Sequence, residues 1–242
     1  MTGSVSPAMT LPFDLAEAVR HLCACDERLQ KLIAETRGFE IDLRDTHSPY
    51  EVLLRSITYQ SISGKAASTI FGRIKALGDN GHPPTPEKML KIRVAKLRKA
   101  GLSAAKAASL KDLAKNALAG IVPTHEEALE LSDEELVERL VSVRGIGAWT
   151  VEMFLIFRLG RPDVLPIHDL GVKKGWSVVY GKKHMPTPKE LLKFGERWRP
   201  YRTVASWYMW RAFEQAGYAF TNKIRAKKAR RKKAGLRQKK KS

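Results

Sequence analysis

Cysteine is nearly absent from this chain of 242 residues, and the two that occur, Cys23 and Cys25, lie two positions apart. On a helix that spacing directs the two thiols to different faces, which argues against a disulfide framework, a zinc site and an iron–sulfur cluster. No apolar run reaches the roughly 18 residues that a membrane span needs. The N-terminus has no basic stretch before an apolar core, so we expect no secretory signal. These absences predict a soluble intracellular protein.

Acidic residues are missing from residues 222–242, which contain twelve Lys or Arg. The formal net charge of the chain is +19, so the other residues still carry +7. A basic tail alone can be a disordered, solubilising arm. A basic body with a basic arm favours a polyanionic partner, above all nucleic acid, with ribosomes and anionic membrane surfaces as the alternatives.

Segments typical of β-strands are also scarce, since the one β-like cluster, Val178-Val179-Tyr180, is too short to build a sheet. Amphipathic segments that follow a helix-capping residue recur instead, which predicts an all-α fold of about ten helices with short connections. We expect helices that start at residues 48, 85 and 124, and helices over residues 13–37, 63–77, 94–100, 103–119, 133–142, 148–159, 170–180, 188–197 and 201–216.

The most informative stretch is residues 141–169. Within it, Arg144-Gly145-Ile146-Gly147 separates two apolar-periodic segments, and the glycines permit a tight turn whose backbone can approach another polymer closely. The helix that follows offers free N–H groups to an anion such as phosphate. An ordinary turn between two helices is the alternative. Asp169 closes a proline-containing loop, either only as a helix cap or as a catalytic carboxylate.

The hairpin, the loop and Asp169 together resemble the helix–hairpin–helix (HhH-GPD) DNA glycosylase superfamily. The resemblance covers about residues 45–216, through three more segments: Tyr50 to Ile57 with Gln60 and Ser63 to Ala67; Gly101-Leu102-Ser103 with Lys106-Ala107; and Trp198 to Arg202 with Ala205, Trp207, Tyr208 and Trp210. It implies a two-lobed fold with the active site in the inter-lobe cleft. We expect residues 1–46 to pack with 170–222 as one lobe, 47–169 to form the other, and 223–242 to be a disordered basic tail.

Trp149 points to one branch of that superfamily. Members that also cut the strand have a lysine nucleophile at this position, and a tryptophan cannot replace it. Trp149 with Asp169 is similar to the 3-methyladenine DNA glycosylase II branch. The resemblance implies a monofunctional glycosylase that flips out alkylated purines of the 3-methyladenine and 7-methylguanine type and leaves an uncut abasic site. A glycosylase for oxidised or deaminated bases and a non-catalytic HhH DNA-binding protein are the alternatives.

The resemblance also assigns roles to single residues. Asp169 is the expected catalytic carboxylate, and Trp149 and Trp210 are the expected aromatic walls of a base pocket, with core packing as the alternative for each tryptophan. Backbone carbonyls of Val141, Val143 and Ile146 are expected to hold a K⁺ or Na⁺ ion, with no cofactor for the chemistry. The expected DNA contacts are Gln60, Ser61, Ile62, Arg144, Gly145, Gly147, Ala148, Thr150 and Lys173.

Two of these assignments have open alternatives. Ser61 matches a position that inserts a bulky side chain into the gap left by a flipped base. Because serine fills such a gap poorly, the alternatives are Ile62 or another loop residue as the wedge, or a less efficient base search. Lys173 contacts phosphate or is a solvated charge. We expect a monomer that binds damaged DNA and no membrane, in the cytoplasm and nucleoid or, in a eukaryote, the nucleus.

Overall fold

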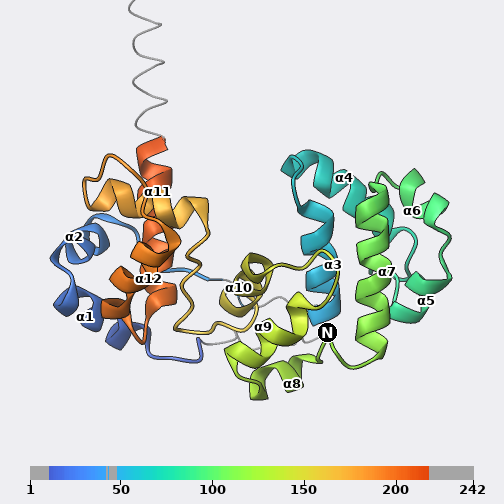
Figure 1. The fold of residues 1–242 in the computed structure, drawn as a ribbon, viewed down its shortest axis with the longest axis horizontal. Helices are drawn as coiled ribbons and strands as arrows, with labels where there is room; N and C mark the ends of the chain where they lie inside the picture. Colours follow the sequence, from blue (N-terminus) through green and yellow to red (C-terminus); the bar gives the residue numbers. More distant parts are fainter. Residues whose placement is uncertain (1–10, 42, 44–47, 218–242) are drawn as a thin grey trace, which may run out of the picture. The chain divides into compact units, whose positions relative to one another are not determined.

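The computed structural model describes residues 11–41, 43 and 48–217, and these residues form helices and connections without a strand (Figure 1). The predicted all-α class is therefore confirmed. The described residues divide into two compact units, one built from residue 11 and residues of the range 41–161, and the other from residues 12–40 and 162–217. Within the described part of the chain, no helix is long and apolar enough to cross a membrane.

The first unit contains eight of the described helices, each of which begins close to the residue that the capping pattern predicts. They are α3 (Pro49–Tyr59), α4 (Gly64–Lys75), α5 (Pro86–Lys91), α6 (Val94–Lys99), α7 (Ala104–Leu118), α8 (His125–Glu130), α9 (Asp133–Val141) and α10 (Ala148–Phe157). Hydroxyl side chains accept the N3 backbone N–H at most of these starts, and Ser48, Thr124 and Ser132 complete capping boxes with a glutamate.

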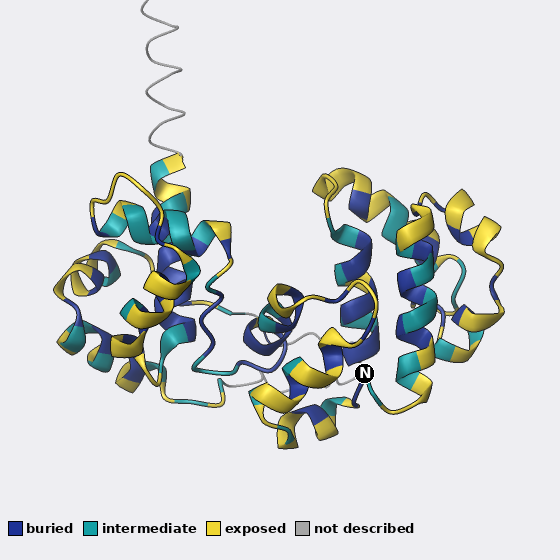
Figure 2. Ribbon diagram, in the orientation of Figure 1, coloured by how far each residue is buried: buried dark blue, intermediate teal, exposed yellow. Residues whose placement is uncertain are grey.

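Helix α7 is the centre of this unit, because α3, α5 and α6 all pack against it. Its buried residues include Ala107, Leu110, Leu113 and Ala114, at the three- and four-residue spacing of one helix face (Figure 2). Polar side chains of the same helix reach the loops beside it. Those contacts shape the candidate site described below.

The second unit contains α1 (Leu15–Cys25), α2 (Glu27–Glu35), α11 (Leu170–Val179), α12 (Pro188–Gly195), the short 3-10 helix η1 (Glu196–Trp198) and the helical residues 202–217. The single helix predicted over residues 13–37 is wrong, since Asp26 adopts an extended conformation (φ −154°) between α1 and α2. Asp26 is buried and caps α2 through the N–H of Leu29, and its Oδ2 accepts hydrogen bonds from Tyr180 (2.5 Å) and Trp198 (3.2 Å). Burial and the hydrogen bond to Asp26 raise the pKa of Tyr180.

The division between the units differs from the predicted one, which placed it after residues 46 and 169. Trp207 of the second unit donates its indole N–H to the carbonyl of Glu40 and packs on Phe39, so the N-terminal segment of this unit ends at Glu40. Likewise, Asp163 is bound by arginines of the second unit, and the loop 162–169 therefore belongs there. Residues 218–242, and with them the predicted basic tail, lie outside the described residues.

Candidate functional site

The glycine turn between α9 and α10 has the backbone shape that its sequence predicts. Gly145 has a φ of +84°, and a Cβ there would lie 2.6 Å from Oγ of Ser109, so both its conformation and its surroundings require glycine. Gly147 is the N-cap of α10, where no side chain caps the helix. A Cβ on Gly147 would meet no atom within 4 Å. The N-terminus of α10 is therefore accessible to an external acceptor such as a phosphate oxygen.

Neighbouring elements of the first unit hold this turn in place. The backbone N–H of Arg144 donates to Oδ2 of Asp112 on α7 at 2.8 Å. Gln60, which follows α3, donates its side-chain amide to the carbonyl of Gly145 at 2.9 Å and lies 3.5 Å from Oγ1 of Thr150. The expected contact residues Gln60, Gly145 and Thr150 are thus brought together by direct hydrogen bonds.

The loop after Gln60 presents the two candidate wedge residues. Ser61 is exposed and has a φ of +56°, a conformation that non-glycine residues rarely adopt. Ile62 is 39% exposed, and Ser63 caps α4 through the N–H of Ala66. The loop therefore exposes one polar and one apolar side chain directly after Gln60, the residue that contacts the turn.

In the second unit, Asp169 does cap a helix, and it has a second donor as well. Its Oδ1 accepts the backbone N–H of Val172 at 2.8 Å and the indole N–H of Trp210 at 2.8 Å. The residue is only 9% exposed. Two N–H donors on one oxygen fix the rotamer of the carboxylate in a partly desolvated setting, where its charge acts most strongly on a nearby cation.

Gly171 makes the contact between Trp210 and Asp169 sterically feasible. A Cβ at this position would lie 2.7 Å from Cδ1 and 3.1 Å from Nε1 of Trp210, and 3.1 Å from Oδ1 of Asp169. One turn later, a Cβ on Gly175 would lie 1.9 Å from the carbonyl oxygen of Met209. These two glycines let α11 approach the helical residues 202–217 closely.

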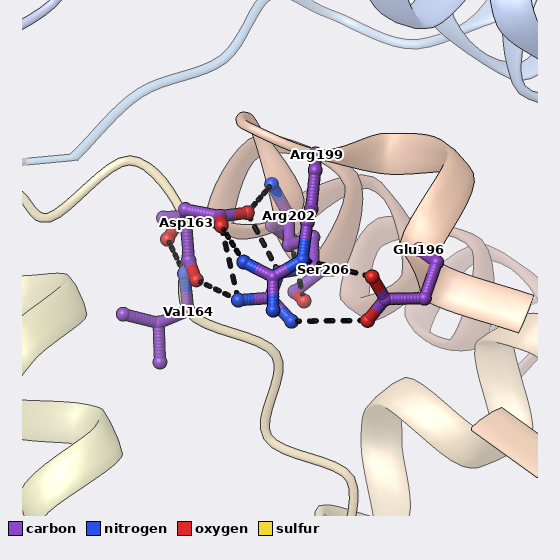
Figure 3. A network of polar contacts seen from close by, with 7 residues as sticks. Asp163, Val164, Glu196, Arg199, Arg202 and Ser206 are labelled. Atoms are coloured by element: carbon purple, nitrogen blue, oxygen red, sulfur yellow. Dashed lines mark hydrogen bonds and ion pairs between the residues drawn. The ribbon is translucent and has the colours of Figure 1, made fainter. Parts of the chain in front are cut away.

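Asp163 anchors the loop that leads to Asp169 (Figure 3). Its carboxylate accepts Nε of Arg202 at 2.6 Å and Nη1 of Arg199 at 2.6 Å, and Glu196 binds Arg199 from the other side. The N–H of Val164 donates to Oγ1 of Thr203 at 3.0 Å. Both ends of the loop 163–169 are thus fixed, one by this network and the other by the cap of α11.

The remaining predicted site residues lie as follows. Trp149 is 47% exposed on the first turn of α10, next to Ala148. Lys173 lies on α11 with its side chain half-buried, and its backbone N–H donates to the carbonyl of Asp169. Sequence reasoning did not identify Gly171 or Asp163 as parts of the site. The pair Gly171 and Gly175, four positions apart on one helix, was a detectable sign of close helix packing, whereas nothing local distinguishes Asp163.

The turn offers oxygen ligands for a cation rather than side-chain ligands. Among the described residues no cluster of three His, Cys, Asp or Glu could hold a metal ion. The carbonyl of Val143 accepts the N–H of Ile146 at 3.1 Å, and a carbonyl oxygen keeps a second lone pair for another partner. Neutral backbone oxygens suit a hard monovalent cation better than a transition metal. The K⁺ or Na⁺ site at the carbonyls of Val141, Val143 and Ile146 stays a prediction, and neutral oxygens of this kind are the ligands that such an ion takes.

The comparisons with known proteins agree with one another on what this chain is similar to. The family profile described as "HhH-GPD superfamily base excision DNA repair protein" matches residues 54–200. DNA-3-methyladenine glycosylase 1 of Schizosaccharomyces pombe is 38% identical over 229 residues, which cover 94% of this chain and 100% of that protein. The solved structure of the S. pombe 3-methyladenine DNA glycosylase Mag1 in complex with abasic DNA aligns with a TM-score of 0.73 at 40% identity, over 80% of this chain and 95% of that one. DNA-3-methyladenine glycosidase from Bacillus halodurans aligns with a TM-score of 0.73 at 34% identity, over 81% and 88%.

Proposed function

This chain belongs to the HhH-GPD superfamily of base excision DNA repair proteins, and from that premise we propose that it is a monofunctional DNA glycosylase for alkylated purines. It hydrolyses the N-glycosidic bond of bases such as 3-methyladenine and 7-methylguanine. The observation that carries this proposal is the buried Asp169 carboxylate held by two N–H donors. Near-full-length similarity to a protein named DNA-3-methyladenine glycosylase 1 supports the same substrate class.

Asp169 supplies the chemistry. As the bond between C1′ of the sugar and the base nitrogen breaks, positive charge develops on the sugar, and a fixed anionic oxygen stabilises that oxocarbenium-like state. Water then bonds to C1′, and its proton passes to the carboxylate or to solvent. Because an N3- or N7-alkylated purine is already cationic, the base departs as a neutral molecule and needs little protonation.

Trp149 and Trp210 have different roles in this scheme. Trp149 is 47% exposed, and aromatic faces attract flat cations like alkylated purines. It also occupies the position where strand-cutting relatives have a lysine, so no Schiff base with the sugar forms and the abasic strand stays intact. Trp210 fixes Oδ1 of Asp169 through its indole N–H, which makes it a positioning residue in addition to a candidate pocket wall.

The turn around Gly145 and Gly147 grips the DNA backbone. The N-terminus of α10 receives a phosphate oxygen, and Arg144, exposed at the turn, contributes a cation. The backbone carbonyls of Val141, Val143 and Ile146 would hold the expected K⁺ or Na⁺, which would supply further positive charge at this turn. The loop of Ser61 and Ile62 enters the base stack when the target base leaves it.

Incubation of the protein with duplex DNA treated with a methylating agent tests this function. The expected products are free methylated purines, identified by chromatography, and strands that break only after alkali treatment. Asp169→Asn should abolish release while DNA binding stays equal or improves, because the variant loses an anion near the phosphates. Asp79→Asn, which changes an exposed aspartate paired with Lys88, is the matched control and should excise normally.

Three results separate the alternatives. Release of oxidised or deaminated bases instead of methylated ones assigns a different lesion class. DNA binding without any base release supports a non-catalytic HhH protein. A nick without alkali contradicts the monofunctional assignment, and wild-type activity of Asp169→Asn contradicts the role of that carboxylate.

A further inference from the structure

Lys106 on α7 makes a pair of contacts that neither DNA gripping nor base hydrolysis uses. Its Nζ donates to the carbonyl of Thr58 at 2.8 Å and to the carbonyl of Gln60 at 2.6 Å. These carbonyls lie at the C-terminal end of α3, where the backbone acceptors lack partners within the helix and the helix dipole favours a cation. The side chain is half-buried, and this burial lowers the pKa of Lys106.

The segment that Lys106 holds leads directly into the loop of residues 60–63, which we call the wedge loop. Ser61 adopts its left-handed conformation one residue after the Gln60 carbonyl. A non-glycine residue in that conformation persists only where its surroundings impose it. On one side Lys106 binds the Gln60 carbonyl, and on the other the Gln60 side chain binds Gly145 of the turn.

Two more side chains of α7 contact the same turn. Oγ of Ser109 lies 2.6 Å from the position of a Cβ on Gly145, and Asp112 accepts the N–H of Arg144 at 2.8 Å. Lys106, Ser109 and Asp112 follow one another at three-residue intervals, so they lie in succession along one side of the helix. Helix α7 thereby connects the wedge loop to the phosphate-gripping turn through its own side chains.

We propose that Lys106 is a positioning residue for base extraction, which sets the wedge loop at a defined place relative to the turn that grips the DNA backbone. The inference rests on the proposed function, because extraction matters only if the protein flips a base out of duplex DNA. A loop that enters the base stack must resist being pushed back. Among the described residues, the hydrogen bonds between this loop and the turn come from the side chain of Gln60, and Lys106 adds a second anchor on α7.

Lys106→Met tests this role by removing the donor and charge while keeping an apolar stem. Single-turnover excision from methylated duplex DNA should slow by about 10- to 100-fold, the scale for a misplaced element. Excision from a methylated single strand, whose bases have no pairing partner to break, should change less than about threefold. A fluorescent base analogue beside the lesion should show weaker unstacking by the variant at saturating protein.

Lys111→Met is the matched control. Lys111 lies on the same helix, donates to a backbone carbonyl at a helix end (Leu90, 2.7 Å), and burial also lowers its pKa, but it holds the end of α5 instead of the wedge loop. This variant should excise from both substrates at near the wild-type rate. Should Lys106→Met fail to fold, Lys106→Arg gives the same comparison, because the planar guanidinium does not reproduce a point contact to two carbonyls.

Several outcomes would overturn the proposal. Equal slowing on duplex and single-stranded DNA means that Lys106 does not act on extraction. The slope of DNA affinity against salt concentration reflects the number of phosphate contacts. If this slope falls by about one contact in Lys106→Met, Lys106 binds DNA directly. Equal losses in Lys106→Met and Lys111→Met mean a general structural role. A wild-type protein that releases no alkylated base from either substrate contradicts the proposed function instead.

Discussion

Replacing Gly171 by alanine should disturb the position of the catalytic carboxylate without unfolding the protein, so the effects on excision and on stability can be measured separately. The added Cβ would lie 2.7 Å from Cδ1 of Trp210, whereas non-bonded carbons prefer about 3.5–4.0 Å. The indole must therefore retreat by about 1 Å, which lengthens its 2.8 Å hydrogen bond to Asp169. A misplacement of about 1 Å in an active site can slow the reaction by about 100-fold.

Stability should change little. Alanine inside a helix is favoured over glycine by about 0.5–1 kcal/mol, which offsets part of the strain from the displaced indole. We therefore expect Gly171→Ala to unfold near the wild-type temperature, yet to excise methylated bases about 10- to 100-fold more slowly. Single-turnover excision and thermal unfolding, measured on the same preparation, check both parts.

Two other glycines serve as controls for this substitution. Gly72 lies within α4 with no atom within 4 Å of its Cβ position, so Gly72→Ala should be as stable as wild type or more so and should excise normally. Gly175→Ala places a Cβ 1.9 Å from a backbone oxygen of Met209 and should lose stability instead. Wild-type excision by folded Gly171→Ala would refute the idea that Trp210 positions Asp169.

Two further substitutions test neighbouring contacts. Trp210→Phe keeps an aromatic ring but removes the N–H donor to Asp169. Single-turnover excision should slow by about tenfold or more, because one charge-assisted hydrogen bond contributes about 1.5–3 kcal/mol. An unchanged rate would mean that Trp210 does not position Asp169 and serves only as a wall of the base pocket. Asp163→Asn removes the charge that binds Arg199 and Arg202. Denaturant unfolding should show that the free energy of unfolding falls by about 1–3 kcal/mol, a range that allows for the partial exposure of the pair. No loss would mean that the network does not stabilise this loop.

Local signals explain why most helices could be predicted. Ser48, Thr124 and Ser132 each satisfy backbone N–H groups at the start of their own helix, so their effect depends on residues three positions away. The same holds for Gly145, whose turn needs a positive φ whatever surrounds it. Asp26 shows the limit, because its buried bonds to Tyr180 and Trp198 join residues more than 150 positions apart and end a helix that periodicity alone would continue.

The sequence by itself determined the all-α class, the starts of most helices, the glycine turn and the candidacy of Asp169, because each depends on neighbours within a helical turn or on a motif with fixed spacing. Only the tertiary structure decided that Trp210 donates to Asp169 and that Gly171 makes room for it. It also decided that Lys106 holds the end of α3. Such contacts join residues 39 or more positions apart, and their geometry follows from how helices pack, which local pattern does not specify.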